Sequence, residues 1–345
     1  MEYFDDSLLI KSLPIKRAAY SDRTAWIMAE LSRLVYENLP GEKSLEKKIA
    51  KIYNLVKENE KKDKVQKLIK KTLAFDDSDS IIKDVLANAG AEFTFLEAFD
   101  ELGTQAMLVK LEKTKDFDGM LILVFRGTEP TSIEDIKTDI QANLVPAKND
   151  GRIHKGFKDA YELIEKELVA EIKKYEDEKL PLYITGHSLG GALAITATKY
   201  LGSDSTGATY TFGGPRVGDD AFFQNIKTPV YRVVNQADAV PRLPFGAGLH
   251  YFLALINFIP INGTRKIAGW IRRNFSGFTH YGTMVFLAEK DTKEVIIKNS
   301  PTIFWRFPYV FPRLMQTKFK ATIQDHSIEA YCDKLRRYAH KRNEK

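Results

Sequence analysis

Apolar and polar positions alternate along the chain with two periods, one typical of helices and one typical of strands. Between Ala18 and Glu37, apolar residues recur every three or four positions after Ser21, a residue type that favours helix N-termini. After Ala91, short apolar runs alternate with longer amphipathic segments: GMLILVFRG, IHKGFKDAYELIEKELVAEIKKY, LPLYITG, GALAITATKYLG, ATYTFGGP and PVYRVVNQAD. This alternation predicts an α/β fold with a mostly parallel central sheet flanked by helices.

We expect a single domain over residues 1–345, from which two segments stand out. Residues 41–72 are rich in lysine, as is typical of solvated helices. Residues 245–278 form an apolar, cap-like insertion, and FWRFPYVFPRLMQTKFK later in the chain has the same mixture of aromatic and basic residues. Such mixtures favour the depth of lipid head groups, so both segments are expected at an acyl-chain pocket or a lipid interface. The insertion residues chosen for this role are Leu253, Phe258 and Trp270. The alternative is a hydrophobic hairpin packed into the protein's own core.

Composition narrows the classes of function. The chain has 345 residues and a net charge of +6. It has one cysteine, so neither an intrachain disulfide nor a cysteine-based metal site is expected. No nucleic-acid motif accompanies the positive charge, which suits an anionic lipid surface instead. The acidic start lacks the features of a secretory signal, and no run reaches the roughly 18 to 20 apolar residues of a membrane span. We expect a cytoplasmic protein, or one exported by another route, that contacts membranes peripherally and needs no cofactor or metal.

The stretch YITGHSLGGALA places Ser188 between glycines two residues away on either side. An apolar run precedes it and an alanine-rich run follows it, so the pattern predicts a strand, a sharp turn at Ser188 and a helix from Gly190 onward. Such a nucleophile elbow exposes one serine hydroxyl. The alternative is an ordinary glycine-serine turn. His187 is expected to be a packed neighbour, since a side chain adjacent to the serine on a tight turn points away from it.

A serine hydroxyl needs a base to remove its proton, and the base needs a carboxylate to orient it. Asp238 follows a predicted strand and is the expected acid, although a turn-forming aspartate before Pro241 is the alternative. Asp219 and Asp220 are weaker candidates because they are expected to begin a helix and to cap it.

Histidines that follow Asp238 supply the candidates for the base. His326 precedes an amphipathic last helix, on a loop that can reach the carboxyl edge of the sheet, and is the preferred base. His280 runs straight into a predicted strand and is expected to support the acid loop through a hydrogen bond, with the role of base as its alternative. His250 lies in the apolar insertion and His340 in a basic tail.

Acyl transfer also requires N–H donors for the oxyanion that forms in the tetrahedral intermediate. Leu189, directly after the nucleophile, is expected to supply one. Thr128, in LVFRGTEP, is the candidate for the second, because Gly127 lets the backbone approach closely. An ordinary turn after a strand is the alternative for this loop.

The ordered series of motifs resembles the class 3 lipase family of α/β hydrolases. It comprises YSDRTAWIMAELSRLVY, LILVFRGT, IHKGF, YITGHSLGGALA, TFGGPRVGDDAF, YRVVNQADAVPRLP, THYG and DHSIEAY. The resemblance implies an α/β-hydrolase fold, Ser188 as nucleophile, Asp238 as acid and His326 as base. It further implies that Thr128 is an oxyanion donor and that a mobile lid lies within Glu129–Asn149. The lysine-rich segment and the long insertion depart from the family pattern.

These features predict a serine hydrolase that cleaves carboxylic esters of lipids, as triacylglycerol lipases do, through an acyl-enzyme. A phospholipase A1 or a short-chain carboxylesterase is the alternative within catalysis. A lipase-like protein that only binds partners is the alternative outside catalysis.

Overall fold

The computed structural model describes most of the chain outside its two unusual segments. The described residues are 2–11, 19–37, 39, 78–115, 117–128, 143–202, 207–244, 277–318 and 320–344. The lysine-rich segment 41–72, most of the insertion 245–278 and most of the expected lid lie outside them, so the roles expected of Leu253, Phe258 and Trp270 stay predictions. Among the helices that are described, none is long and apolar enough to cross a membrane.

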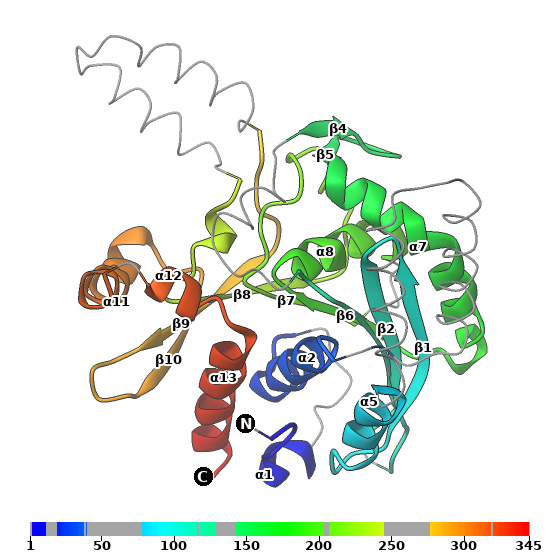
Figure 1. Cartoon of the computed structure of the whole chain (residues 1–345), viewed down its shortest axis with the longest axis horizontal. Coiled ribbons are helices and arrows are strands. Elements are labelled where there is room, and N and C mark those ends of the chain that lie inside the picture. The colour runs from blue at the N-terminus through cyan, green and yellow to red at the C-terminus, as the bar shows by residue number, and fades with distance from the viewer. Residues whose placement is uncertain are drawn as a thin grey trace, which may run out of the picture.

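A sheet of eight strands, in the order β1-β2-β3-β6-β7-β8-β9-β10, forms the centre of the protein (Figure 1). Strands β3, β6, β7, β8 and β9 run parallel to one another, and the pairs at both edges are antiparallel. The strands are β1 (Phe93–Glu101), β2 (Thr104–Leu111), β3 (Met120–Phe125), β6 (Leu182–His187), β7 (Thr209–Phe212), β8 (Val230–Asn235), β9 (Thr283–Glu289) and β10 (Val295–Asn299). A separate two-stranded sheet joins β4 (Leu144–Pro146) and β5 (Arg152–His154).

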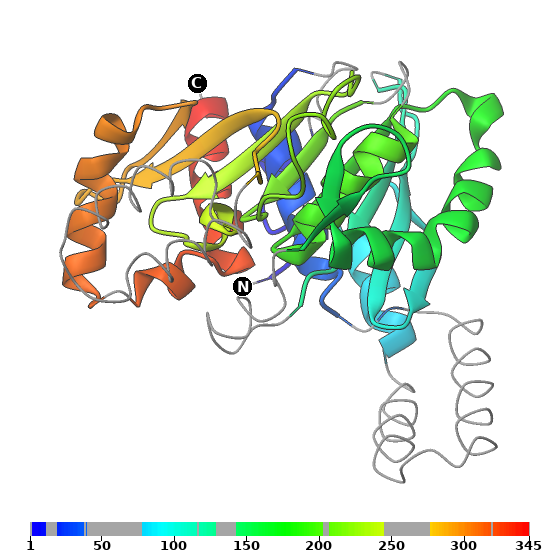
Figure 2. The ribbon, with the colours of Figure 1, turned by 90° about the horizontal axis from the view of Figure 1, so that it is seen from above.

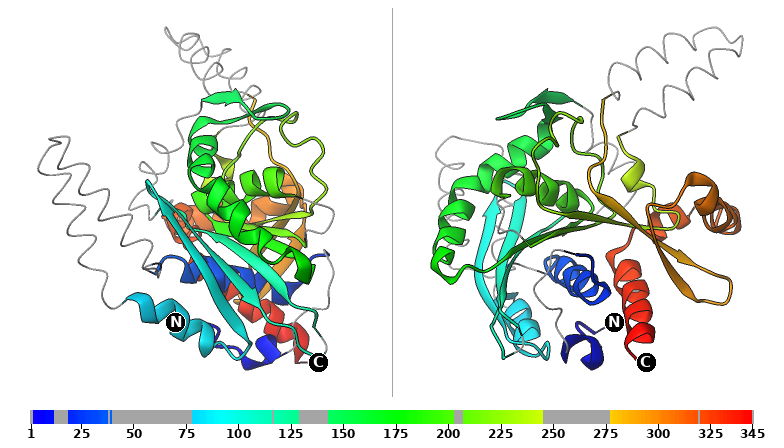
Figure 3. Two further views of the ribbon diagram at one scale, coloured as in Figure 1. Left: turned by 90° about the vertical axis from the view of Figure 1, so that its right-hand side faces the viewer. Right: turned by 180° about the vertical axis from the view of Figure 1, so that it is seen from behind.

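Helices cover both faces of the large sheet, as the views in Figures 1 and 3 show. One face packs against α1 (Ser7–Lys11), α2 (Asp22–Leu34), α5 (Ser78–Ala87) and α13 (Ile328–Asn343). The other face packs against α7 (Lys155–Lys173) and α8 (Leu189–Leu201). The remaining helices are α11 (Ile303–Gln316), α12 (Ala321–Gln324) and the short 3-10 turns η1 (Glu176–Glu178) and η2 (Val240–Arg242).

The central strands read as continuous apolar runs because helices bury both of their faces. All six residues of β6 are buried, and so are all six of β3. At the start of α2, the Ser21 side chain accepts a hydrogen bond from the Thr24 N–H, as predicted. The predicted α/β-hydrolase fold with a mostly parallel sheet is confirmed.

The helix expected to begin at Asp219 and Asp220 is absent, and the prediction is wrong there. Residues 220–225 form turns instead. The Asp219 carboxylate accepts hydrogen bonds from the N–H groups of Phe222 and Arg152 and pairs with the Arg152 side chain. Asp219 therefore joins this turn to β5, which explains the acidic residue without a helix.

Helix α11 lies at the end of the sheet formed by β9 and β10, whereas α7 lies toward the opposite end (Figures 1 and 2). Its contacts with the strands involve Trp305, Tyr309 and Val310, which pack against a small cluster that includes Phe286. The opposite side of α11 is exposed.

Candidate active site

Ser188 lies at the sharp turn between β6 and α8, with backbone angles φ 57° and ψ −127°. A non-glycine residue at positive φ is strained, and such strain is typical of functional turns. The neighbouring glycines make the turn possible. A Cβ atom at Gly186 would lie 2.3 Å from the Gly190 carbonyl oxygen, and one at Gly190 would lie 2.4 Å from the Phe125 carbonyl oxygen. The elbow predicted at YITGHSLGGALA is therefore present, with Ser188 at its tip.

Ser188, His326 and Asp238 form a continuous chain of hydrogen bonds. The Ser188 hydroxyl lies 2.9 Å from His326 Nε2, and His326 Nδ1 lies 3.0 Å from both carboxylate oxygens of Asp238. A carboxylate only accepts, so Nδ1 carries the proton toward Asp238 and leaves Nε2 to accept from the serine. All three side chains are buried, with at most 4% of any residue exposed. The structure thus brings His326 together with Asp238, 88 positions away, and with Ser188, 138 positions away.

Two further donors hold the Asp238 carboxylate. The Tyr331 hydroxyl lies 2.5 Å from Asp238 Oδ2, and the Val240 N–H donates to Oδ1 over 2.9 Å. Burial and the negative charge of Asp238 raise the pKa of Tyr331 well above its ordinary value, so the phenol stays protonated and donates. The same hydroxyl accepts from the Asn235 N–H. Tyr331 received no role in the sequence analysis, yet it fixes the orientation of the acid.

A neighbouring acid, Asp325, ties the loop of the base to the loop of the acid. Its carboxylate accepts from the Ala237 N–H over 3.0 Å, and its backbone oxygen accepts from the Asn235 side chain over 2.9 Å. Arg313 of α11 pairs with the same carboxylate at 2.8 Å. Because Ala237 and Asp325 directly precede Asp238 and His326, these contacts set the spacing between acid and base.

The His187 side chain supports the backbone of His326. His187 Nε2 lies 2.6 Å from the His326 carbonyl oxygen, and His187 Nδ1 lies 2.9 Å from the Tyr36 hydroxyl. A carbonyl only accepts, so Nε2 carries the hydrogen and Nδ1 accepts from Tyr36. Burial, and then the neighbouring His326, lowers the pKa of His187 well below its ordinary value. His187 is therefore a buried, packed neighbour, as predicted; in addition, it is neutral and has a definite supporting contact.

His280 lies beside the acid loop and contacts its backbone. His280 Nε2 donates to the Pro241 carbonyl oxygen over 2.6 Å, which confirms the predicted hydrogen bond. Burial, followed by the positive charges of Arg232 and Arg216, lowers the pKa of His280 well below its ordinary value. The triad hydrogen bonds to Ser188 and Asp238 come from His326 instead.

Gly213 leaves room for the acid and the base of the triad. Its φ is +62°, and a Cβ atom there would lie 2.7 Å from Asp238 Oδ2 and 2.9 Å from His326 Nδ1. Both values are closer than ordinary van der Waals contact. The glycine in TFGGP therefore allows acid and base to pack against the end of β7.

The two expected oxyanion donors are the residue directly after the nucleophile and a residue of the loop after β3. Leu189 is the first residue of α8, and N–H groups in the first turn of a helix have no partner within that helix. Thr128 is exposed in the loop that follows β3. Its neighbour Gly127 lies so close to the elbow that a Cβ atom there would be 3.2 Å from Ser188 Cβ.

Comparisons with known proteins agree with this geometry. A model of the class 3 lipase family, described as "Lipase (class 3)", matches residues 122–247, which include Ser188 and Asp238 but not His326. A lipase of Rhizomucor miehei is 36% identical over 171 residues, covering 44% of this chain and 45% of its own. The secreted mono- and diacylglycerol lipase 1 of Fusarium solani is 41% identical over 99 residues, 27% of this chain and 29% of its own.

A plant relative shows the same partial match. The triacylglycerol lipase OBL1 of Arabidopsis thaliana is 31% identical over 196 residues, which cover 42% of this chain and 38% of that protein. The chain thus spans less than half the length of each of these relatives. The matched region contains the elbow and the acid loop, with the fold and motif order expected of the family. Over residues 122–247, the chain is similar to the class 3 lipase family.

Proposed function

We propose that this protein hydrolyses carboxylic esters of lipids through an acyl-enzyme formed on Ser188. The observation that carries the proposal is the hydrogen-bonded series Ser188–His326–Asp238, which starts at a strained elbow between β6 and α8. A serine so placed is activated by its base, and the base is held in the required tautomer by its acid.

In the first half of the reaction, Ser188 Oγ attacks the ester carbonyl carbon while His326 Nε2 takes the hydroxyl proton. The resulting imidazolium is stabilised by the Asp238 carboxylate, which Tyr331 and Val240 keep oriented. His326 then gives the proton to the departing alcohol oxygen as the carbon–oxygen bond breaks. In the second half, water attacks the acyl-enzyme, His326 takes its proton and returns it to Ser188, and the free acid leaves.

We assign the backbone N–H groups of Leu189 and Thr128 to the oxyanion. The Leu189 N–H belongs to the first turn of α8, where the helix dipole also favours negative charge. Thr128 follows Gly127, whose backbone lies beside Ser188. Donors fixed in place before the reaction stabilise the intermediate without reorganisation, which is usually a large part of catalysis by serine hydrolases.

Acylglycerols are the proposed substrate class, because the Fusarium and Arabidopsis relatives carry the names of acylglycerol lipases. Phospholipids hydrolysed by a phospholipase A1 activity, and short soluble esters, are the competing substrates. Parallel assays with triacylglycerols, diacylglycerols, phosphatidylcholine and nitrophenyl esters, resolving each released fatty acid, separate the three.

Labelling with a fluorophosphonate probe tests the chemistry itself. The wild-type protein is expected to be labelled on Ser188, and Ser188→Ala is expected to remain unlabelled. A folded wild-type protein that neither reacts with the probe nor cleaves any ester would instead favour a lipase-like protein that only binds partners.

A further inference from the structure

A groove of about 570 Å³ lies between α11 and the ends of β8 and β9, next to the acid loop. Its walls combine aromatic and aliphatic side chains, such as Phe286, Phe307 and Val310, with three arginines, Arg216, Arg242 and Arg306. We call it the arginine groove. The described residues that line it include no aspartate and no glutamate.

The arginines of this groove repel one another. Burial, and then repulsion from Arg216 and Arg306 of the groove, lowers the pKa of the buried Arg232 to about 10. Burial and then the charge of Arg242 lower the pKa of Arg306. Within the described part of the chain, none of these arginines forms an ion pair with a carboxylate, whereas Arg313 on the same helix does. The charge of Asp238 acts on Arg242, but among the described residues no carboxylate pairs directly with the arginines that line the groove.

The outer side of α11 is unusually apolar for a surface helix. Five large apolar side chains follow the spacing of one helical face and are between 45% and 85% exposed: Ile303, Phe304, Phe307, Phe311 and Met315. We call this the apolar face of α11. The rings of Phe307 and Phe311 stack on each other at 5.0 Å. Contiguous exposed apolar surface of this kind marks a binding surface.

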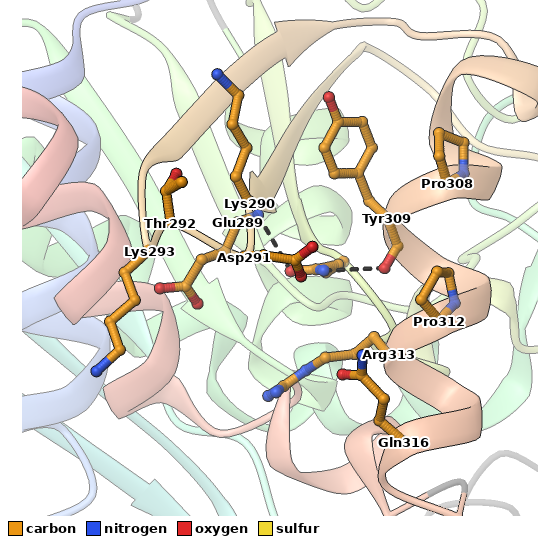
Figure 4. Close-up of a pocket in the computed structure, with 11 residues that line it drawn as sticks. Glu289, Lys290, Asp291, Thr292, Lys293, Pro308, Tyr309, Pro312, Arg313 and Gln316 are labelled. Carbon is orange, nitrogen blue, oxygen red and sulfur yellow. Dashed lines mark hydrogen bonds between the residues drawn. The ribbon is translucent and has the colours of Figure 1, made fainter.

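The inner side of α11 is firmly attached. Trp305 packs edge-to-face against Phe286 with 6.3 Å between ring centroids, and the Gln236 amide donates to the Tyr309 carbonyl oxygen over 2.9 Å (Figure 4). Arg313, one turn further along, pairs with Asp325. The apolar face is therefore held outward by a helix whose other face is fixed to the sheet.

We propose that α11 and the arginine groove form a membrane-docking surface, in which the groove binds the phosphate of an anionic phospholipid and the apolar face enters the acyl layer. Guanidinium groups match phosphate geometry, and apolar groove walls suit the adjoining lipid chain. Amphipathic helices with aromatic and basic residues bind membranes at this depth.

A membrane fits these residues better than a single soluble amphiphile does. Phe304 is 85% exposed and Met315 is 45% exposed, yet neither lines the groove. The apolar surface thus extends beyond what one ligand in the groove covers, as a lipid layer requires. Docking through α11 would also bring lipid near the triad, because Arg313 holds Asp325, the residue before His326.

Co-sedimentation with vesicles tests this surface independently of the proposed hydrolysis. Each protein is the full chain carrying Ser188→Ala, so that the lipids stay intact and loss of binding is distinct from loss of chemistry. Vesicles of phosphatidylcholine are compared with vesicles that also contain phosphatidylserine. Arg242→Gln plus Arg306→Gln alters the charges, and Phe304→Ser plus Phe311→Ser alters the apolar face.

The parent is expected to prefer the anionic vesicles. Since each cation at an anionic surface contributes about fivefold in affinity, the charge variant should bind them about 25-fold more weakly. The apolar variant should lose on the order of tenfold or more with both kinds of vesicle. Matched controls alter the other end of the protein: Lys166→Gln plus Lys173→Gln for charge, and Leu102→Ser plus Leu163→Ser, at sites 62% and 40% exposed, for apolar surface. They should bind as the parent does.

Circular dichroism verifies that all variants remain folded, which is favoured because the side chains altered in addition to Ser188 are exposed, except for the half-buried Arg306. Equal sedimentation of parent, charge variant and apolar variant would overturn the proposal. So would equal binding of the parent to both kinds of vesicle. Binding of monomeric laurate without vesicle binding would assign the arginine groove to a soluble fatty acid and likewise overturn membrane docking.

Discussion

Replacing Gly213 by alanine should remove most activity, because the new methyl group would occupy the space under the acid and the base. The added Cβ atom would lie 2.7 Å from Asp238 Oδ2, whereas ordinary contact begins at 3.4 Å, so the carboxylate must shift by about 0.7 Å. A misplacement of about 1 Å in a catalytic group costs on the order of 10²-fold in rate. We therefore expect kcat for a nitrophenyl ester to fall by about that factor.

The same substitution also strains the backbone, and a second glycine separates the two effects. Gly103, in the turn between β1 and β2, has φ +92°, yet nothing lies within 4 Å of a Cβ atom built there. Backbone strain should thus lower the stability of Gly103→Ala by about 1 to 3 kcal/mol, while its kcat stays unchanged. Gly213→Ala should lose comparable or greater stability together with its activity.

The assay pairs initial rates at saturating ester with thermal unfolding of both variants. If Gly213→Ala kept the wild-type kcat while its stability fell as that of Gly103→Ala does, the acid and base would not need this glycine, and the reasoning would be refuted.

Three further predictions concern the triad and one buried acid. Ser188→Ala and His326→Ala should each abolish nearly all esterase activity, with the double variant scarcely worse, because triad members act as a unit; His280→Ala should retain far more. Asp238→Asn should keep the fold and lower kcat by on the order of 10⁴, since the amide no longer selects the right imidazole tautomer, and near-full activity would contradict that role. Burial raises the pKa of Glu30 from 4.5 to about 7, so the folded state retains a proton that the unfolded state releases. Stability should fall as pH rises between those values, by on the order of 3 kcal/mol, and urea titrations should show that Glu30→Gln lacks this fall.

Features that depend on neighbouring residues were predictable from the sequence. The elbow at Ser188 is determined by a strand, two glycines and a helix that are contiguous in the chain. The preference for His326 over His280 followed from local context as well, because His280 leads into β9 and His326 precedes α13. These local patterns were sufficient to nominate all three residues that the structure joins by hydrogen bonds.

The supporting contacts could not be predicted because they join distant parts of the chain. An amphipathic last helix predicts that the Tyr331 ring is buried, but not that its hydroxyl meets Asp238, 93 positions away. Asp219 appeared to start a helix because the same acidic residue type caps helices and pairs with arginine, and only the fold brings Arg152 to it. Helix α11 contains Pro308 and Pro312, which ordinarily interrupt helices, so composition indicated its surface character but not its conformation.

The hydrogen bond between Tyr36 and His187 has a consequence for the order of folding. It joins residues 151 positions apart, and the hydrogen bond from Ser188 to His326 joins residues 138 positions apart. Contacts between residues so distant in sequence form late, since much chain entropy is lost before they stabilise anything. The site is complete only after the first helices, the central strands and the last helix have docked together. Recovery of catalysis during refolding therefore reports the final assembly of the chain, and not the earlier formation of its helices and strands.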